Sequence, residues 1–140
     1  MGLAVQHVYL QTQQLFSEAS DQALWGDFYW TTANVANLTY QQGQDVVVRG
    51  QFVDNGYLAD TSETNYRAIN DDYPVFAYSV DLGDVTTTAK STLFTVGLLQ
   101  KEVIQFEGGP NTTSILPGYW TNYFSTNADA VRTVTLAKEL

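Results

Sequence analysis

Residues 65–85 read NYRAINDDYPVFAYSVDLGDV, and this stretch decides the fold that we expect. The Asn-Asp-Asp run at 70–72 favours a turn, because short polar side chains bond to nearby backbone groups. Pro74 disfavours a helix and favours an extended backbone at Tyr73. A strand should therefore begin directly after the turn.

The residues after Pro74 alternate between two faces, as side chains of a strand do. One face is apolar throughout and consists of Phe76, Tyr78, Val80 and Leu82. The other face carries Val75, Ala77, Ser79 and Asp81. Gly83 ends the run, so the pattern predicts a strand over residues 74–82.

Similar alternation and β-favouring residues mark further strands along the chain. We predict these at residues 5–16, 27–32, 35–41, 91–100 and 103–106. The Thr-rich residues 84–90 should join the strands on either side as a hairpin. The remaining connections are predicted as a loop or short helical turn at 17–24, a turn at 42–44, a long polar connection at 55–72, and a turn or loop at 108–111.

Three segments carry helical signals. Residues 45–55 include three consecutive Val, which favour a strand, but Asp45 as a cap and Gly56 as a stop favour the helix that we predict. Gly50 weakens that helix by about 1 kcal/mol relative to Ala. Within residues 117–124, aromatic pairs at i, i+4 indicate helical backbone. Residues 128–140, capped by Ser125 or Asn127, suit an amphipathic helix or a frayed tail.

The sum of these elements is a mainly β chain. We predict an antiparallel β sandwich with one or two short helices, in a single domain over residues 1–140. A chain of this length buries about two thirds of the surface that its unfolded form exposes, so it can form a core.

Four long blocks of the chain carry a resemblance to a known family. The first of them is the stretch quoted above, residues 65–85. The others are WGDFYWTTANVANLTYQ (25–41), VVRGQFVDNGYLA (47–59) and STLFTVGLLQKEVIQFEG (91–108). Together they resemble the fungal secreted glutaminase A family over residues 5–127. The likeness maps to the later part of the β-sandwich domain that precedes the catalytic helical barrel of those longer proteins.

The resemblance implies a β sandwich, in agreement with the pattern, and an extracellular location. Nothing in the chain resembles the catalytic barrel, so the family's activity does not follow. Residues 1–2 are not followed by a basic and then an apolar region, so we see no signal peptide in this chain. Two glycosylation triplets, starting at Asn37 and Asn111, are compatible with secretion but are also frequent by chance.

The charge balance limits the partners. The formal net charge is −9, from six Lys and Arg against fifteen Asp and Glu. This balance argues against nucleic acid, whose phosphates require a basic surface, and against anionic lipid. No apolar run approaches the roughly 20 residues that span a membrane. Cysteine is absent, which excludes disulfides, thiolate metal ligands and cysteine nucleophiles.

The titratable residues predict no catalytic site. His7 is the single histidine, and on a strand it is expected to be a packed or surface side chain. Asp71 and Asp72 are the best candidates for a cation site, but solvated turn acids explain them better, and we predict no metal or other cofactor. Arg49 and Arg67 lie among acids and should form structural ion pairs.

Aromatic side chains form the most suggestive set. Tyr and Trp beside Asn, Asp and Gln suit a sugar-binding face, since a ring covers the C–H face of a pyranose and the polar groups bond its hydroxyls. Most of these rings should fill the core. A ligand site is predicted at Tyr57, Tyr66, Asp71, Asp72, Tyr119 and Trp120.

The leading functional hypothesis is a non-catalytic β-sandwich module of the glutaminase A family, with a ligand-binding, lectin-like role toward carbohydrate or a role in assembly. The alternatives are a glutaminase, hydrolysing L-glutamine to L-glutamate, and an inactive fragment of one. Since only part of the family's β domain is matched, exposed apolar surface or strand edges should lead to a homodimer.

Overall fold

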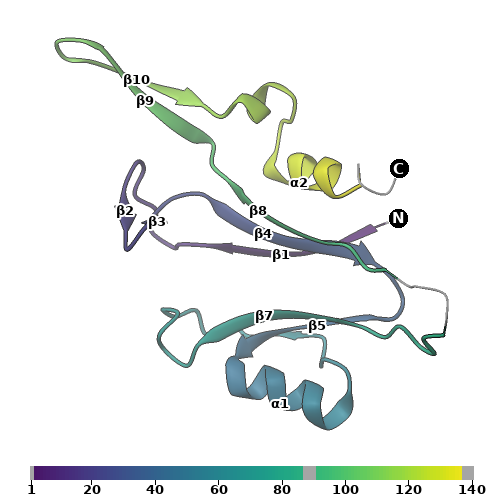
Figure 1. Cartoon of the computed structure of the whole chain (residues 1–140). Coiled ribbons are helices and arrows are strands. Elements are labelled where there is room, and N and C mark those ends of the chain that lie inside the picture. Colours follow the sequence, from purple (N-terminus) through teal and green to yellow (C-terminus); the bar gives the residue numbers. More distant parts are fainter. Residues whose placement is uncertain (1, 87–90, 137–140) are drawn as a thin grey trace. The chain divides into compact units, whose positions relative to one another are not determined.

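A computed structural model describes residues 2–86 and 91–136 of the chain (Figure 1). Contacts divide the chain into two compact units. The first unit contains Leu3–Ala33 and the chain from Leu93 onward, and the second contains Asn34–Thr92. Each unit holds its own small sheet, so each is described by itself.

The first unit is built on a three-stranded sheet. Its strands are β1 (Gly2–Tyr9), β4 (Asp27–Asn34) and β8 (Phe94–Leu99), in the order β1-β4-β8. β4 and β8 are antiparallel, with Tyr29 opposite Gly97. The buried side chains of β4 include Tyr29, Thr31 and Thr32, so the central strand forms the core of this unit.

Two hairpins and two helical segments extend the first unit. The hairpins are β2 (Glu18–Ala19) with β3 (Gln22–Ala23), and β9 (Glu102–Gly109) with β10 (Thr112–Pro117), both antiparallel. The β9–β10 hairpin runs outward as a two-stranded ribbon (Figure 1). The helical segments are the 3₁₀ helix η1 (Tyr119–Asn122) and α2 (Asn127–Leu136).

Helix α2 is fixed to the sheet by buried residues. Ala130 and Thr135 are 3% and 2% exposed, and the Thr135 hydroxyl lies 2.8 Å from the Thr31 hydroxyl on β4. At the other end, the Thr126 hydroxyl accepts a hydrogen bond from the Asp129 backbone N–H and donates one to its carboxylate. Thr126 is therefore the side chain that caps α2.

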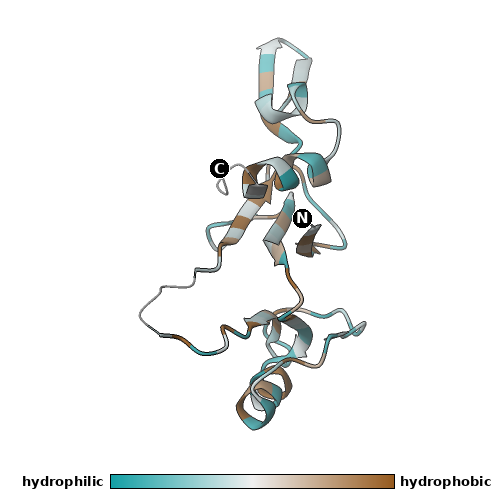
Figure 2. Cartoon of the chain, turned by 90° about the vertical axis from the view of Figure 1, so that its right-hand side faces the viewer, coloured by the Kyte–Doolittle hydropathy of each residue, from teal (hydrophilic) through white to brown (hydrophobic). Residues whose placement is uncertain are grey.

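The second unit consists of one helix on a smaller sheet. β5 (Leu38–Gln44) pairs antiparallel with β7 (Pro74–Val80) and parallel with the two-residue β6 (Thr61–Ser62). α1 (Asp45–Asn55) follows β5 directly and contacts β5 and β7. Along α1 hydrophobic and hydrophilic residues are interspersed (Figure 2), and Val48 is the residue that it buries.

The predicted fold class is confirmed. The chain is mainly β and carries two short α-helices. The strand pairs β4–β8, β5–β7 and β9–β10 are all antiparallel. The predicted helix over residues 45–55 is also confirmed at both ends, since Gly56 adopts the left-handed backbone of a helix stop, with a φ of 75°. Asp45 lies in the first turn, however, and Gln44 takes the cap position without a side-chain bond.

Several element predictions are wrong. β1 ends at Tyr9, well before residue 16, and the predicted loop over residues 17–24 contains the β2–β3 hairpin. The predicted turn at residues 42–44 is the end of β5. Tyr73 was predicted to have an extended backbone, but its φ is 43°. The left-handed backbone of Asp72 in the turn before Pro74 thus continues through Tyr73.

The largest error concerns strand pairing. β7 and β8 are neighbours in sequence and were expected to form a hairpin, yet β7 pairs with β5 and β8 with β4. Residues 87–90 of the predicted hairpin loop lie outside the described residues. β10 was missed because its Thr- and Ser-containing start lacks a clear apolar alternation. Ser125 and Asn127, the predicted caps of the last helix, flank the actual cap, Thr126.

Candidate functional site

The candidate site in the first unit is a pair of exposed tyrosines, Tyr119 at the start of η1 and Tyr123 directly after its end. Tyr119 and Tyr123 are 74% and 65% exposed. Their ring centroids lie 5.3 Å apart at an interplanar angle of 72°, and the Tyr123 hydroxyl donates to the Tyr119 hydroxyl at 2.9 Å. The two rings therefore hold each other in an edge-to-face arrangement, which we call the tyrosine platform.

Residues beneath the platform fix its position. The Trp120 indole N–H donates to the Gln100 carbonyl at 3.0 Å, and the Gly118 N–H donates to the Lys101 carbonyl at 2.8 Å. The Thr121 hydroxyl donates to the Gly118 carbonyl at 2.8 Å. The first two bonds tie η1 to the segment between β8 and β9, and the third closes the first turn of η1, so the platform is held in place from both sides of Tyr119.

Gly118 is required by the close approach of Trp120. A Cβ on Gly118 would lie 2.8 Å from the Trp120 indole nitrogen and 3.1 Å from the Gln100 carbonyl oxygen. The second of these atoms belongs to the backbone and cannot move freely. The Gly-Tyr-Trp sequence at 118–120 thus sets the entry into η1.

The Tyr119 hydroxyl raises the pKa of Tyr123 above its ordinary value, with a further rise from desolvation. The hydrogen bond acts because Tyr123 donates it, so it stabilises the neutral phenol. The Tyr119 oxygen accepts this bond, which leaves the Tyr119 O–H available to donate to a ligand. The platform thus offers both a ring surface and a polar edge.

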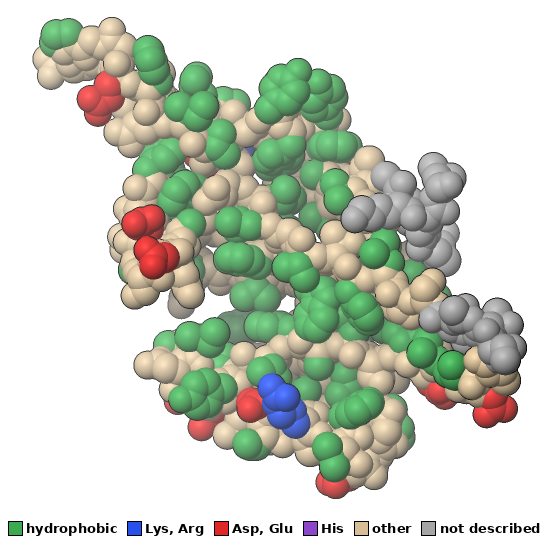
Figure 3. Space-filling view, in the orientation of Figure 1, with side chains coloured by type: hydrophobic (Ala, Val, Ile, Leu, Met, Phe, Trp, Pro, Cys, Tyr) green, Lys and Arg blue, Asp and Glu red, His purple; other side chains and the backbone are tan. Residues whose placement is uncertain are grey.

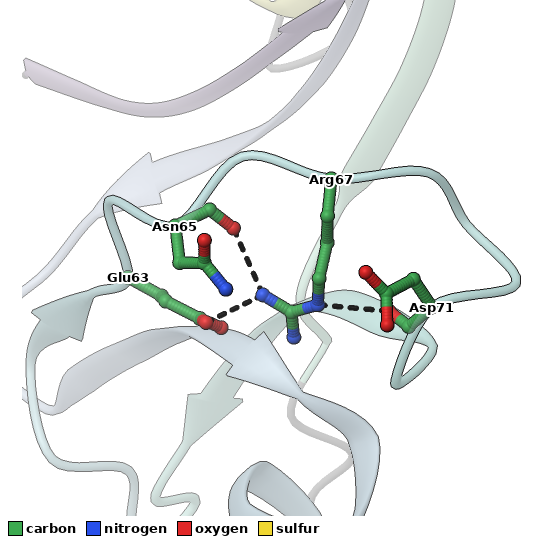
Figure 4. A network of polar contacts seen from close by, with 4 residues as sticks. All are labelled: Glu63, Asn65, Arg67 and Asp71. Carbon is green, nitrogen blue, oxygen red and sulfur yellow. Dashed lines mark hydrogen bonds and ion pairs between the residues drawn. The ribbon is translucent and has the colours of Figure 1, made fainter.

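The second unit presents a different candidate, the long connection between α1 and β7. Its centre is Arg67, which lies between Glu63, Asn65 and Asp71 (Figure 4). The Arg67 side chain is 7% exposed. The Arg67 guanidinium forms an ion pair with Glu63 at 2.5 Å and donates to the Asn65 carbonyl at 2.9 Å and the Asp71 carbonyl at 2.8 Å. The bond to Glu63 is the main cause that raises the pKa of Arg67 above its ordinary value. Arg67 therefore closes this connection into an ordered loop.

The predicted ligand residues of this loop are all exposed. Tyr57 and Tyr66 are 54% and 89% exposed, and the side chains of Asp71 and Asp72 also face solvent. Asp71 uses its backbone carbonyl, not its carboxylate, to hold Arg67 (Figure 4). Across residues 2–86 and 91–136, no group of three or more His, Asp or Glu side chains is suited to a metal ion.

A polar cluster around His7 was not predicted from the sequence. The imidazole stacks on Tyr29 with centroids 4.4 Å apart and an interplanar angle of 5°, and its Nε2 lies 3.3 Å from Asp27 Oδ1. Asn127 donates to the other Asp27 oxygen at 2.8 Å. Burial raises the pKa of Tyr29, as does Asp27 to a smaller degree, whereas a bond from Asn127 lowers it. The cluster joins β1, β4 and the first residue of α2.

The structure brings some predicted site residues together and separates others. Tyr119 pairs with Tyr123, whereas Trp120 supports the platform with its indole instead of presenting a free ring. The expectation that most aromatic rings fill the core is wrong, since Tyr29 is the buried aromatic among the described residues.

A face rich in exposed hydrophobic side chains, with few Lys or Arg, is seen in Figure 3. Both expected ion pairs exist, Arg49 with Asp45 and Arg67 with Glu63.

The family can be stated from the sequence match. A family described as Domain of unknown function (DUF5127) matches residues 1–136. This chain belongs to the DUF5127 family. No solved structure matches the chain significantly.

This DUF5127 chain is similar in sequence to two fungal glutaminases. Glutaminase A of Aspergillus oryzae (strain ATCC 42149 / RIB 40) is 51% identical over 130 residues, which cover 93% of this chain and 19% of the relative. A probable glutaminase of Arthroderma benhamiae (strain ATCC MYA-4681 / CBS 112371) is 29% identical over 122 residues, covering 81% of this chain and 14% of the relative. The chain thus spans less than a fifth of the length of either, and the predicted resemblance to glutaminase A is confirmed.

In the described residues no helix is long and apolar enough to cross a membrane.

Proposed function

We propose that this chain is a non-catalytic module of a glutaminase-type protein and that it binds neutral carbohydrate on the tyrosine platform. The observation that carries the proposal is the pair Tyr119 and Tyr123, two largely exposed rings locked to each other and supported by Trp120. Rings of this size exposed to water at a fixed geometry have no evident role in stability, whereas they suit a ligand.

The chemistry of the platform favours a sugar. The C–H face of a pyranose packs on an aromatic ring, and the sugar hydroxyls bond to polar groups at its edge. The Tyr119 O–H can donate and the Tyr123 oxygen can accept, since only one bond between them is used. The net charge of −9 disfavours acidic glycans, so neutral ones are the proposed class.

A binding role fits the chain better than hydrolysis. Amide hydrolysis needs an activated nucleophile or water and an oxyanion site. The single histidine is held between the rings of Tyr9 and Tyr29 and paired to Asp27, and among the residues that the structure describes its contacts include no serine or threonine. We place the glutaminase activity that the relatives' names state in parts of those longer proteins that this chain does not match. By the same likeness, we propose an extracellular location.

A glycan array followed by calorimetric titration tests the proposal. Wild-type protein should bind neutral gluco-, manno- or chito-oligosaccharides in preference to polygalacturonate. Tyr119→Ala and Tyr123→Ala should each weaken binding about 10-fold or more, the equivalent of about 1.4 kcal/mol. Tyr66→Ala is the matched control, because Tyr66 is 89% exposed and lies in the second unit.

Two results would overturn the proposal. If Tyr66→Ala abolishes binding and the platform variants do not, the site is the Arg67-ordered loop. If the purified wild-type chain releases ammonia from glutamine, and a substitution in this chain stops the release, the chain is catalytic.

A further inference from the structure

The β9–β10 ribbon ends in a turn that carries a modification motif. Asn111, Thr112 and Thr113 form an Asn-x-Thr triplet in which the middle residue is not Pro. Pro110 and Asn111 are the turn residues between the two strands, and all of residues 109–113 are exposed. The motif therefore lies at the tip of a ribbon that extends from the first unit (Figure 1).

The turn fixes Asn111 in an accessible backbone conformation. Its φ is 62°, in the left-handed region that Asn tolerates better than most residues. Proline followed by a residue with positive φ is the order found in a type II turn. Asn111 is exposed, and within residues 2–86 and 91–136 its side-chain amide forms no hydrogen bond.

The other triplet of the chain lies in a different environment. The Asn37 side-chain amide donates a hydrogen bond to the Asp81 backbone carbonyl, which joins the start of β5 to the end of β7. The Asp81 N–H returns a bond to the Asn37 carbonyl at 3.1 Å. Asn37 also lines a depression next to Val80 and Leu82. A glycan on Asn37 would replace one of the two N–H groups of an amide that is already engaged with Asp81, and would place the sugar against the depression.

We propose that Asn111, and not Asn37, is a site of N-linked glycosylation in the folded, secreted protein. The donor class is a lipid pyrophosphate-linked oligosaccharide. The Asn111 Nδ2 forms a bond to C1 of the first sugar while the bond from C1 to the pyrophosphate oxygen breaks. The lipid pyrophosphate leaves, and the amide proton passes to solvent. The natural occurrence of the modification rests on the proposed extracellular location.

Secretion from a glycosylating eukaryotic host, with a foreign leader peptide, provides the test. Intact mass and endoglycosidase digestion should show one N-glycan on the secreted wild-type chain. Asn111→Gln and Thr113→Ala should each remove it, whereas Asn37→Gln should retain it. Thr113→Ala keeps the asparagine and removes only the hydroxyl that the motif needs, so it separates recognition of the motif from loss of the acceptor.

An unmodified wild-type chain, or one that keeps its glycan in both Asn111→Gln and Thr113→Ala, would overturn the inference. A second glycan lost in Asn37→Gln would overturn the exclusion of Asn37. Because the leader is foreign and the readout is mass, these outcomes are independent of whether the tyrosine platform binds sugar.

Discussion

At the scale of single residues, a buried pair of hydroxyls decides how α2 is held on β4. Thr31 and Thr135 are 0% and 2% exposed and lie 2.8 Å apart. The Thr135 hydroxyl donates to the Val131 carbonyl at 2.9 Å, so the shared hydrogen must come from Thr31. The two threonines therefore have unequal roles.

This asymmetry predicts a pattern in a double-mutant cycle. Thr135→Val leaves the Thr31 O–H buried without an acceptor and should cost about 1–3 kcal/mol, whereas Thr31→Val removes only a donor and should cost less. The double variant should be no less stable than Thr135→Val alone, because no buried polar group is then left unpaired. Urea unfolding measures all three. If Thr31→Val and Thr135→Val lost equal amounts of stability, and the double variant lost the sum of the two, the assignment of Thr31 as the donor would be contradicted.

A second residue-scale prediction concerns Tyr123, whose pKa is raised because it donates to Tyr119. A raised pKa in the folded state means that this bond contributes fully below the unfolded tyrosine pKa of about 10, and that the contribution is lost as the pH rises through the folded pKa. Tyr119→Phe removes the acceptor, so Tyr123 should then ionise at lower pH. Ultraviolet titration of tyrosinate measures this shift, and Tyr123→Phe identifies which part of the curve belongs to Tyr123. If the bond were absent in solution, the titration curve of Tyr119→Phe would show no shift in the part that belongs to Tyr123.

The sequence indicated only part of the tyrosine platform. The i, i+4 spacing of Tyr119 and Tyr123 indicated helical backbone, and the two rings do lie against each other, but the predicted site named Tyr119 and Trp120 and left Tyr123 out. That Trp120 turns its indole inward to Gln100, whereas Tyr66 points to solvent, depends on tertiary contacts that no local pattern encodes. The His7–Asp27–Asn127 cluster was missed for the same reason, since it joins residues far apart in the chain.

At the scale of elements, two glycines predict substitutions of opposite sign. Gly118→Ala would place a Cβ against Trp120 and the Gln100 carbonyl, and should cost about 1–3 kcal/mol. Gly50 lies inside α1, and a Cβ added there would have nothing within 4 Å, so Gly50→Ala should stabilise the helix by about 0.5–1 kcal/mol. Thermal unfolding of both variants makes the comparison, and stabilisation by Gly118→Ala would contradict the tight support of η1.

Local signals explain which elements could be predicted. α1 was bounded correctly because Gly56 provides a strong stop. The starts of β4 and β7 were predicted correctly because their alternation is regular, but β4 continues to Asn34 and β7 already ends at Val80. The pairing of β7 with β5 could not be read from adjacency, because a hairpin is the usual connection for neighbouring strands. Short elements such as β2, β3 and β6, of two residues each, carry too little pattern to be recognised.

At the scale of the whole molecule, the balance of buried and exposed apolar side chains predicts self-association. In the described residues the buried hydrophobic side chains are Tyr29, Val48, Leu58 and Ala130. Many others are exposed, and on the β9–β10 ribbon these include Ile104, Phe106 and Ile115 at 50–56%. A two-stranded ribbon with exposed apolar side chains is a favourable surface for a second copy.

We therefore expect a dimer at high micromolar concentration. Apolar burial at about 25 cal/mol per Å² can outweigh the repulsion between chains of charge −9, which salt screens over about 8 Å. Light scattering across a concentration series measures the mass. Phe106→Ser should shift the equilibrium toward monomer, with Val53→Ser, an 80% exposed position on α1, as the control. A wild-type chain that stays monomeric throughout would contradict this expectation.

The central claim is that the tyrosine platform binds neutral sugar, and chemical-shift mapping tests it most directly. Isotope-labelled protein is titrated with gluco-, manno- and chito-oligosaccharides. The account predicts saturable shifts at residues 119–123, foremost Tyr119 and Tyr123. These shifts should disappear in Tyr119→Ala and Tyr123→Ala and persist in Tyr66→Ala. Saturable shifts confined to the loop around Tyr66 and Arg67, or no shifts with any of these sugars at millimolar concentration, would contradict it.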